Sequence, residues 1–381
     1  MEQVQSPVIP VVAEWIASHP GTISLGQGVV HYGAPGAVQQ AVCQAVEGGD
    51  SRLDRYGFVG GLPELRQGIA DKASCENGID LSHQEIVVTA GSNMAFLNAV
   101  LAITDPGDEI ILPGPYYFNH HMAIEMACCH AVVVPTTRQY QLDLAAIEAA
   151  MTDHTRAIVT VSPNNPTGAV YSRQALTAVN ELCRQHACYH VADEAYEYFT
   201  YGEVEHFSPA SLPTAAAHTI SLYSLSKAYG MAGWRCGYMI VPRHLLTSIK
   251  KIQDTNLICP AMVCQVAAMA ALTAGRVWAD AQIAPLHAVR EQVLTELSQL
   301  GQRCRFPEPA GAFYVLVEFE TQKQDLDLVH DLICDWGVAV LPGSTFGVSQ
   351  GCTLRIAFGG LAPLTVAEGL GRLRRGLEYL L

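Results

Sequence analysis

The sequence predicts an α/β protein, with a large domain whose mostly parallel central sheet is flanked by helices and a smaller α+β domain formed by both ends of the chain. The chain has 381 residues, far more than one small core requires, so two domains are expected. From residue 85 onward, short apolar segments alternate with helical patterns, which is typical of parallel sheets. After residue 242 the chain becomes helical, and the mixed strands and helices of the C-terminal region then alternate differently from the central block, which indicates a second structural unit.

The predicted strands of the large domain are short apolar runs that end in small or polar residues. We expect strands at residues 86–89, 109–112, 131–134, 157–161, 189–192 and 219–223, with helices at 94–103, 144–151 and 172–185. Residues 237–241 are expected to form an edge strand of the same sheet.

The two ends of the chain are assigned to the smaller domain. After the sheet of the large domain we expect helices at 262–274 and 278–300. The mixed region that follows is expected to have strands at 313–317, 338–341 and 353–357 and helices at 326–336 and 364–380. The first 45 residues are predicted to form an arm with a short helix. The predicted boundaries are therefore 1–45 for the arm and part of the small domain, 46–288 for the large domain and 289–381 for the C-terminal small domain.

Composition argues against several classes of partner. The net charge is −14 and no basic block occurs, so neither nucleic acid nor an anionic membrane surface is expected to bind. No apolar run in the sequence reaches the roughly 18 residues of a membrane span, and the N-terminus lacks the pattern of a signal peptide.

The chain has twelve cysteines, and none of them forms a C-x-x-C motif. We expect free thiols and a cytoplasmic protein, since reducing compartments keep thiols unpaired. Cys183, His186, Cys188 and His190 resemble a zinc cluster in spacing, but a helix running into a strand would scatter their directions, so packing is the favoured interpretation and no metal is expected.

One lysine stands out at the end of a predicted strand. Lys227 lies between Ser224 and Ser226 on one side and Arg235 on the other. A desolvated lysine suits a Schiff base, while hydroxyls and a guanidinium suit a phosphate dianion. Together they indicate a pyridoxal phosphate site. Alone, the segment is equally compatible with a solvated surface loop.

Further polar residues follow other strands. Gly91, Ser92 and Asn93 enter a helix whose N-terminus offers an anion site. Asp193 ends a strand, where α/β sheets bind ligands, although a helix N-cap is the alternative. Arg355 points off one face of a strand, either toward solvent or toward an anion. Gly26 and Gly28 do not complete a dinucleotide-binding loop.

Six short motifs occur along the chain, namely Tyr56-Gly-x-x-Gly60, Gly91-Ser-Asn93, Asn164-Asn-Pro-Thr-Gly168, Asp193-Glu-x-Tyr196, Ser224-x-Ser-Lys227 with Arg235, and Leu354-Arg-Ile-Ala-Phe358. In this order and spacing, these motifs identify the chain as similar to the class I and II aminotransferases, which are fold-type I pyridoxal phosphate enzymes. The resemblance spans nearly the whole chain.

The resemblance implies a role for each motif residue. Lys227 would bind pyridoxal 5′-phosphate covalently and move the substrate proton, Asp193 would pair with the ring nitrogen, and Tyr196 and Asn165 would donate to the phenolic oxygen. Tyr117, rather than Tyr116, would stack on the ring. The phosphate would be held by Gly91, Ser92, Asn93, Ser224, Ser226 and Arg235.

Substrate and partner residues are implied in the same way. Arg355 would bind the substrate carboxylate, helped by Asn165 and the Gly28 amide. Tyr56 would reach the phosphate of the neighbouring subunit, so a homodimer is expected.

The expected reaction is transamination between an L-amino acid and a 2-oxo acid. The same motifs serve pyridoxal phosphate lyases, such as C–S β-lyases or enzymes similar to aminocyclopropanecarboxylate synthase, and the motifs do not separate the two. A non-catalytic regulator is disfavoured, because the chain is acidic and no DNA-binding segment precedes residue 20.

Two departures from the family pattern bear on the substrate. Aspartate-using relatives have a lysine where this chain has Asn93, so dicarboxylate specificity is doubtful, although an aspartate-type enzyme remains the alternative. The segment 28–35, which lines the substrate entrance in relatives, contains His31 and Tyr32 in place of an acidic pattern. We therefore expect a neutral or aromatic amino acid, with His31 and Tyr32 either lining the entrance or packing the arm.

Overall fold

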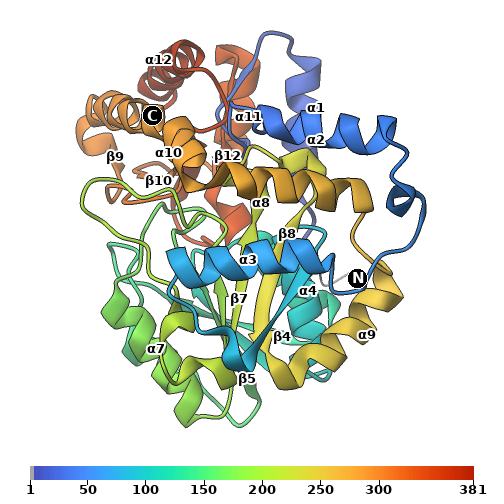
Figure 1. The fold of residues 1–381 in the computed structure, drawn as a ribbon. Coiled ribbons are helices and arrows are strands. Elements are labelled where there is room, and N and C mark those ends of the chain that lie inside the picture. The colour runs from blue at the N-terminus through green and yellow to red at the C-terminus, as the bar shows by residue number, and fades with distance from the viewer. Residues whose placement is uncertain (1–3) are drawn as a thin grey trace.

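The computed structural model describes residues 4–381 and confirms the predicted α/β class (Figure 1). Its main sheet has seven strands in the order β2-β8-β7-β6-β5-β3-β4. The pairings show that β8 runs in the direction opposite to that of the other six strands of this sheet. The strands are β2 (Gln84–Thr89), β3 (Glu109–Gly114), β4 (His130–Pro135), β5 (Thr155–Val161), β6 (Tyr189–Asp193), β7 (Thr219–Ser224) and β8 (Gly237–Pro242).

The prediction of an edge strand at residues 237–241 is wrong. β8 lies between β2 and β7, and all six of its residues are buried. A strand covered on both faces reads as a continuous apolar run, which this segment shows. The edges are β2 and β4, and most residues of β4 are partly or fully exposed.

Alternating residues of the strands pack into two separate layers. Ile110 and Val159 belong to a cluster with residues of α4 and α9, whereas their neighbours Ile111 and Ile158 pack with residues of α6 and α7. This is the period of two that a sheet covered on both faces requires. The helices of this domain include α3 (Pro63–Glu76), α4 (Ser92–Ile103), α5 (Phe118–Met126), α6 (Leu144–Ala149), α7 (Arg173–Gln185) and α9 (Leu246–Asn256).

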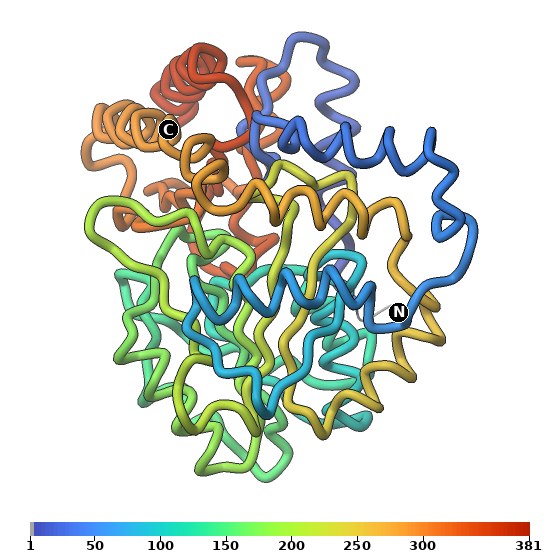
Figure 2. The backbone as a smooth tube through the Cα atoms, in the orientation of Figure 1, coloured from blue at the N-terminus to red at the C-terminus, as the bar shows by residue number. Residues whose placement is uncertain are grey.

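The two ends of the chain pack together, as the blue and red segments at the top of Figure 2 show. β1 (Ile23–Ser24) pairs in parallel with β11 (Val338–Ala339), and α1 (Val8–Ser18) contacts α11 (Asp325–Trp336). An antiparallel sheet of order β12-β13-β10-β9 completes this region. Its strands are β9 (Cys304–Arg305), β10 (Tyr314–Phe319), β12 (Leu341–Pro342) and β13 (Cys352–Ala357), and α12 (Pro363–Leu380) follows them.

The single strand predicted at residues 338–341 is two strands in the structure. β11 pairs with β1, whereas β12 pairs with β13 in the other sheet. The apolar run is continuous in sequence, so only the pairing partners reveal the division.

A long helix connects the two regions. α10 (Met262–Ser298) packs against α2 (Gly36–Glu47), α3 and α12, and its backbone breaks at Gly275 (φ 69°, ψ −172°). The predicted helices 262–274 and 278–300 correspond to its two halves, and the predicted boundary at 288/289 falls inside it. By length and composition α10 could cross a membrane, a criterion that the core helices of soluble proteins also meet.

All twelve cysteines have free thiols. Cys183 and Cys188 belong to the core around α7, and the buried His190 ring is held by Thr160 (2.8 Å) and Asn180 (3.1 Å). Within residues 4–381, no group of three or more side chains is arranged to hold a metal ion.

Candidate active site

A cavity of about 260 Å³ lies where the parallel strands β5 and β6 end, beside β13 of the smaller domain. Every predicted site residue except Gly91 and Tyr56 lines it. Six further residues that the sequence did not single out for the site also line it, namely Ile9, Phe118, Asn119, Val161, Ala195 and Tyr314.

Lys227 lies on α8 (Leu225–Ala228), a single turn that begins directly after β7. The Ser224 hydroxyl accepts a hydrogen bond from the Ser226 amide (3.1 Å) and so caps this turn. The Lys227 ammonium donates to the Gly28 carbonyl. Burial, reinforced by the charges of Arg355 and Arg235, lowers the pKa of Lys227 to about 8. The amine is therefore partly neutral near physiological pH, as a nucleophile requires.

Cationic and amide donors converge beside Lys227. Arg235 Nη1 lies 3.4 Å from the Ser226 hydroxyl, and a Cβ at position 91 would lie only 2.5 Å from Arg235 Nη2. Gly91 also has a φ of +83°, which side chains rarely adopt. Gly91 is the N-cap of α4, so the bare helix amides face the same space as the guanidinium. This arrangement suits a phosphate dianion.

Asp193 forms the buried acidic wall of the cavity, and its partner was missed from the sequence. His120 Nε2 lies 3.1 Å from Asp193 Oδ2, and the other carboxylate oxygen accepts from the Ala195 amide (3.1 Å). Phe96 stacks on the His120 ring at 4.0 Å between centroids. His120 lies on α5, a helix that the sequence analysis did not anticipate, so no motif pointed to it.

Arg355 lies on β13, also lines the cavity and is 3% exposed. Its Nη1 donates to Asn165 Oδ1 (2.9 Å) and its Nη2 donates to the Gly26 carbonyl. The guanidinium is held between the rings of Tyr314 (4.6 Å) and Phe346 (4.7 Å). Its buried Nε has no partner among the described residues. An orphaned, buried donor on a cation is suited to a carboxylate ligand.

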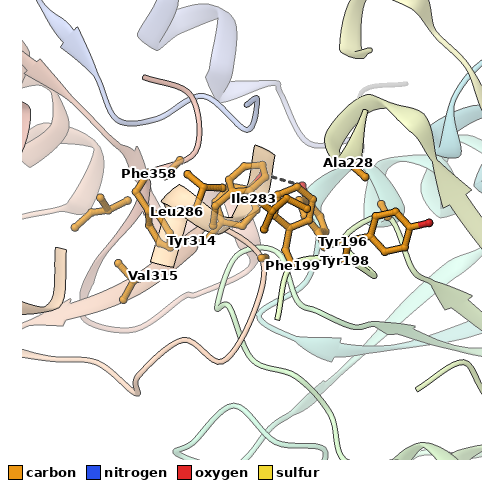
Figure 3. Packing of buried hydrophobic residues seen from close by; sticks show 14 of the residues in the cluster. Tyr196, Tyr198, Phe199, Ala228, Ile283, Leu286, Tyr314, Val315 and Phe358 are labelled. Carbon is orange, nitrogen blue, oxygen red and sulfur yellow. Dashed lines mark hydrogen bonds between the residues drawn. The ribbon is translucent and has the colours of Figure 1, made fainter. Parts of the chain in front are cut away.

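Aromatic residues complete the cavity. Tyr117 lines it and its hydroxyl accepts from the Asn119 amide (2.8 Å), whereas Tyr116 stacks on His121 and does not line it. The Tyr117 hydroxyl also donates to Asn93 Oδ1 (3.3 Å). Asn93 thus contacts the aromatic wall, in addition to lying beside the helix N-terminus. The hydroxyls of Tyr196 and Tyr314 lie 2.7 Å apart, and the dashed line in Figure 3 marks this hydrogen bond.

The sequence profile of aminotransferase class I and II matches residues 20–373. The chain belongs to this family. An aromatic aminotransferase of Arabidopsis thaliana is 33% identical over 384 residues, covering 98% of this chain and 94% of the relative. An aspartate/prephenate aminotransferase of Thermus thermophilus is also 33% identical, over 361 residues, covering 93% of this chain and 89% of the relative.

Solved structures agree with this assignment. An aromatic aminotransferase of Pyrococcus horikoshii superimposes with a TM-score of 0.88 at 31% identity, covering 97% of this chain and 99% of that structure. The Thermus thermophilus aspartate aminotransferase with maleate gives a TM-score of 0.90 at 29% identity, covering 98% of each chain. The protein is therefore a pyridoxal phosphate-dependent aminotransferase with the fold-type I architecture.

Two sets of predicted residues lie outside the aminotransferase cavity. Tyr56 is 81% exposed and lines a separate groove with residues such as Cys259 and Met262. His31 is exposed and Tyr32 is half-buried, and neither lines the cavity of its own chain. The Tyr32 hydroxyl instead donates to the carbonyls of Lys227 (3.1 Å) and Ala228 (3.3 Å). Tyr32 thus packs the arm against the lysine turn, which is the second of the two interpretations considered from the sequence.

Proposed function

We propose that this aminotransferase binds pyridoxal 5′-phosphate through Lys227 and transfers the amino group of a neutral or aromatic L-amino acid to a 2-oxo acid. The observation that carries the proposal is the position of Lys227, whose lowered pKa makes it nucleophilic, between an anion pocket and a buried arginine with an unpaired donor. We further propose that it works as a homodimer in the cytoplasm, where its free thiols would stay reduced.

The residues present fit the cofactor at each of its functional groups. Ser92, Ser224, Ser226 and Arg235 would hold the phosphate, because the cavity places a helix N-terminus, hydroxyls and a guanidinium together. Asp193, held by His120, would face the ring nitrogen. Tyr117 would cover the ring and Tyr196 would donate to its phenolic oxygen. When bound, the cofactor supplies an electron sink for the negative charge that develops at the substrate Cα.

The chain's own groups carry the remaining steps. Arg355 and the Asn165 side chain orient the substrate carboxylate, and this fixes which Cα bond faces the cofactor ring. The neutral Lys227 amine would then take the proton from Cα and return it to the carbon on the other side of the transferred nitrogen. Its pKa of about 8 suits a general acid–base group near neutral pH.

The cavity favours a substrate without a distal charge. Its cations are Lys227, Arg235 and Arg355, and each already has a role with the cofactor or the substrate α-carboxylate. Apart from Asp193, which the proposal assigns to the cofactor ring nitrogen, the other lining residues are apolar, aromatic or neutral, with Ile9, Phe118 and Asn119 among them. The similar proteins are named for both aromatic and aspartate/prephenate substrates, so their names leave the choice open.

Half-reactions test this choice. The cofactor-loaded protein is mixed with phenylalanine, methionine, glutamine or aspartate, and conversion of the bound cofactor to its amino form is followed by absorbance. We expect the three neutral donors to react faster than aspartate. Equal or faster turnover of aspartate would contradict the proposed substrate class. Release of ammonia or pyruvate without a 2-oxo acid acceptor would instead indicate a lyase.

The exposed Tyr56 and Phe58 support the dimer. Tyr56 is 81% exposed and Phe58 is 65% exposed. Exposing these aromatic rings to water is unfavourable, and burial against a second copy of the chain would remove that exposure. If Tyr56 serves the neighbouring site, mixing Lys227→Ala with Tyr56→Ala subunits rebuilds one intact site in each hybrid dimer. We expect such mixtures to regain activity. Hybrids that form but stay inactive would place Tyr56 in the site of its own chain.

A further inference from the structure

Tyr314 places a second hydroxyl beside that of Tyr196 in the cavity. It begins β10, where it pairs with Ala357 of β13, and its hydroxyl lies 2.7 Å from that of Tyr196 (Figure 3). Tyr196 is 5% exposed and Tyr314 is fully buried. Neither hydroxyl has any other hydrogen-bond partner among the described residues. Each hydroxyl therefore depends on the other for its hydrogen bond within the chain.

The surroundings hold the Tyr314 hydroxyl in this direction. A Cβ at position 28 would lie 2.5 Å from the Tyr314 oxygen, so only glycine allows the arm to pass there. On the other side, the Tyr314 ring lies 4.6 Å from the Arg355 guanidinium. The ring thus packs against Arg355, to which the proposed function assigns the substrate carboxylate. The hydroxyl is held beside that of Tyr196. These two parts of one side chain can be separated by substitution.

We propose that Tyr314 is a positioning residue that donates its proton to the Tyr196 hydroxyl and thereby strengthens the hydrogen bond that Tyr196 offers to the cofactor's phenolic oxygen. This inference rests on the proposed function, because it requires the cofactor oxygen beside Tyr196. Only one of the two hydroxyls can donate in their shared bond. If Tyr314 donates, the proton of Tyr196 stays free for an acceptor in the cavity, and the three oxygens form one directed chain.

The consequence is a shift in the protonation of the bound cofactor. A donor that itself accepts a hydrogen bond is polarised, which strengthens its own donation by about 10–30%. The phenolic oxygen carries more negative charge after the nitrogen that links Lys227 to the cofactor has lost its proton. Stronger donation to that oxygen therefore favours the deprotonated nitrogen. Tyr314 is expected to lower the pH at which the nitrogen titrates.

The test is a pH titration of the absorbance of the cofactor-loaded protein without substrate. A hydrogen bond to a charged group is worth about 1.5–3 kcal/mol, so Tyr196→Phe is expected to raise the spectral midpoint by about 1–2 pH units. Tyr314→Phe is expected to raise it by about 0.1–0.6 units, the cooperative 10–30% of the same bond. In the Tyr196→Phe background, Tyr314→Phe is expected to add no further shift.

Tyr201 provides the matched control. Its hydroxyl is also buried and donates to the Ala312 carbonyl (2.6 Å), but Tyr201 does not line the cavity. Tyr201→Phe loses a buried hydrogen bond without changing the spectral midpoint. Tyr314→Phe also keeps the ring beside Arg355, so the KM for the carboxylate substrate is expected to stay within about twofold, whereas Tyr314→Leu raises it.

The outcomes separate this inference from the proposed function. A shift in Tyr196→Phe with none in Tyr314→Phe overturns the role of Tyr314 and leaves the function standing. A Tyr314→Phe shift that persists in the Tyr196→Phe background shows a direct effect and also overturns it. No shift in Tyr196→Phe means that Tyr196 does not contact the cofactor oxygen, and then the proposed arrangement of the site fails as well.

Discussion

Lys227 is expected to destabilise the protein in the absence of cofactor. Burial lowers its pKa from 10.5 to about 8, so the folded chain binds this proton less tightly than the unfolded chain. A difference of about 2.5 units at 1.36 kcal/mol per unit corresponds to an unfavourable contribution of about 3 kcal/mol. Below pH 8 both states are protonated at Lys227 and the unfavourable contribution is fully present. Between pH 8 and pH 10.5 the unfolded chain holds this proton and the folded chain releases it, so the contribution decreases, and above pH 10.5 it is absent.

Lys227→Met removes the charge while keeping an unbranched side chain of similar length. We expect the cofactor-free variant to be more stable than the cofactor-free parent at pH 7. Removing the desolvated charge contributes up to about 3 kcal/mol, and the lost hydrogen bond to the Gly28 carbonyl takes about 1 kcal/mol from this gain. The measurement is urea unfolding of both proteins at one protein concentration, since dimerisation would make stability depend on concentration. The exposed Lys251→Met is the matched control and should change stability little.

The pH dependence makes this reasoning refutable. The stability difference between parent and Lys227→Met should shrink steadily between pH 8 and pH 10.5, while other groups that titrate there cancel in the comparison. A variant that is less stable than the parent at pH 7, or a difference that does not change with pH, would show that Lys227 is not held as a desolvated amine.

Three further substitutions test other parts of the site. Gly91→Ala is expected to weaken cofactor binding at least about tenfold in titrations of the cofactor-free protein, because the methyl group would lie 2.5 Å from Arg235. Gly21→Ala is the control: Gly21 has a similar φ of +88° but no atom within 4 Å of the added methyl group, so this variant should leave the cofactor affinity unchanged. Arg355→Ala is expected to raise the KM of both amino acid and 2-oxo acid by at least about 30-fold in steady-state kinetics, since losing one partner of a buried charge pair costs about 2–5 kcal/mol. An unchanged KM would show that Arg355 does not bind the substrate carboxylate. His120→Phe is expected to lower kcat by about tenfold while KM changes little, because the Asp193 carboxylate would lose the contact that fixes its orientation. A change in KM alone would argue against this positioning role of His120.

The sequence was most informative where function depends on consecutive residues. The turn from Ser224 to Lys227 and the Gly91-Ser92 helix entrance each form from neighbours in the chain, and the structure places both beside one cavity. Strand alternation predicted that polar residues such as Asp193 would meet at the carboxyl edge of the sheet. Aminotransferase class I and II membership followed from the order of these local motifs, and the family profile confirms it.

The sequence was least informative where a residue acts through a distant contact. His120 and Tyr314 belong to no motif, yet they contact Asp193 and Tyr196 directly. The strand order failed at β8 for a related reason, because an apolar run does not reveal which strands lie on either side of it.

The sequence by itself determined the family and singled out Lys227 with Ser92, Ser224, Ser226 and Arg235, which the structure brings to one cavity, because these residues belong to short local motifs. Only the tertiary structure decided how these groups are tuned. Folding buries Lys227 enough to lower its pKa, encloses Arg355 between two rings and aligns the Tyr314 hydroxyl with that of Tyr196. Desolvation and hydrogen-bond direction are properties of packed surroundings, and those surroundings come from segments that are far apart in the chain.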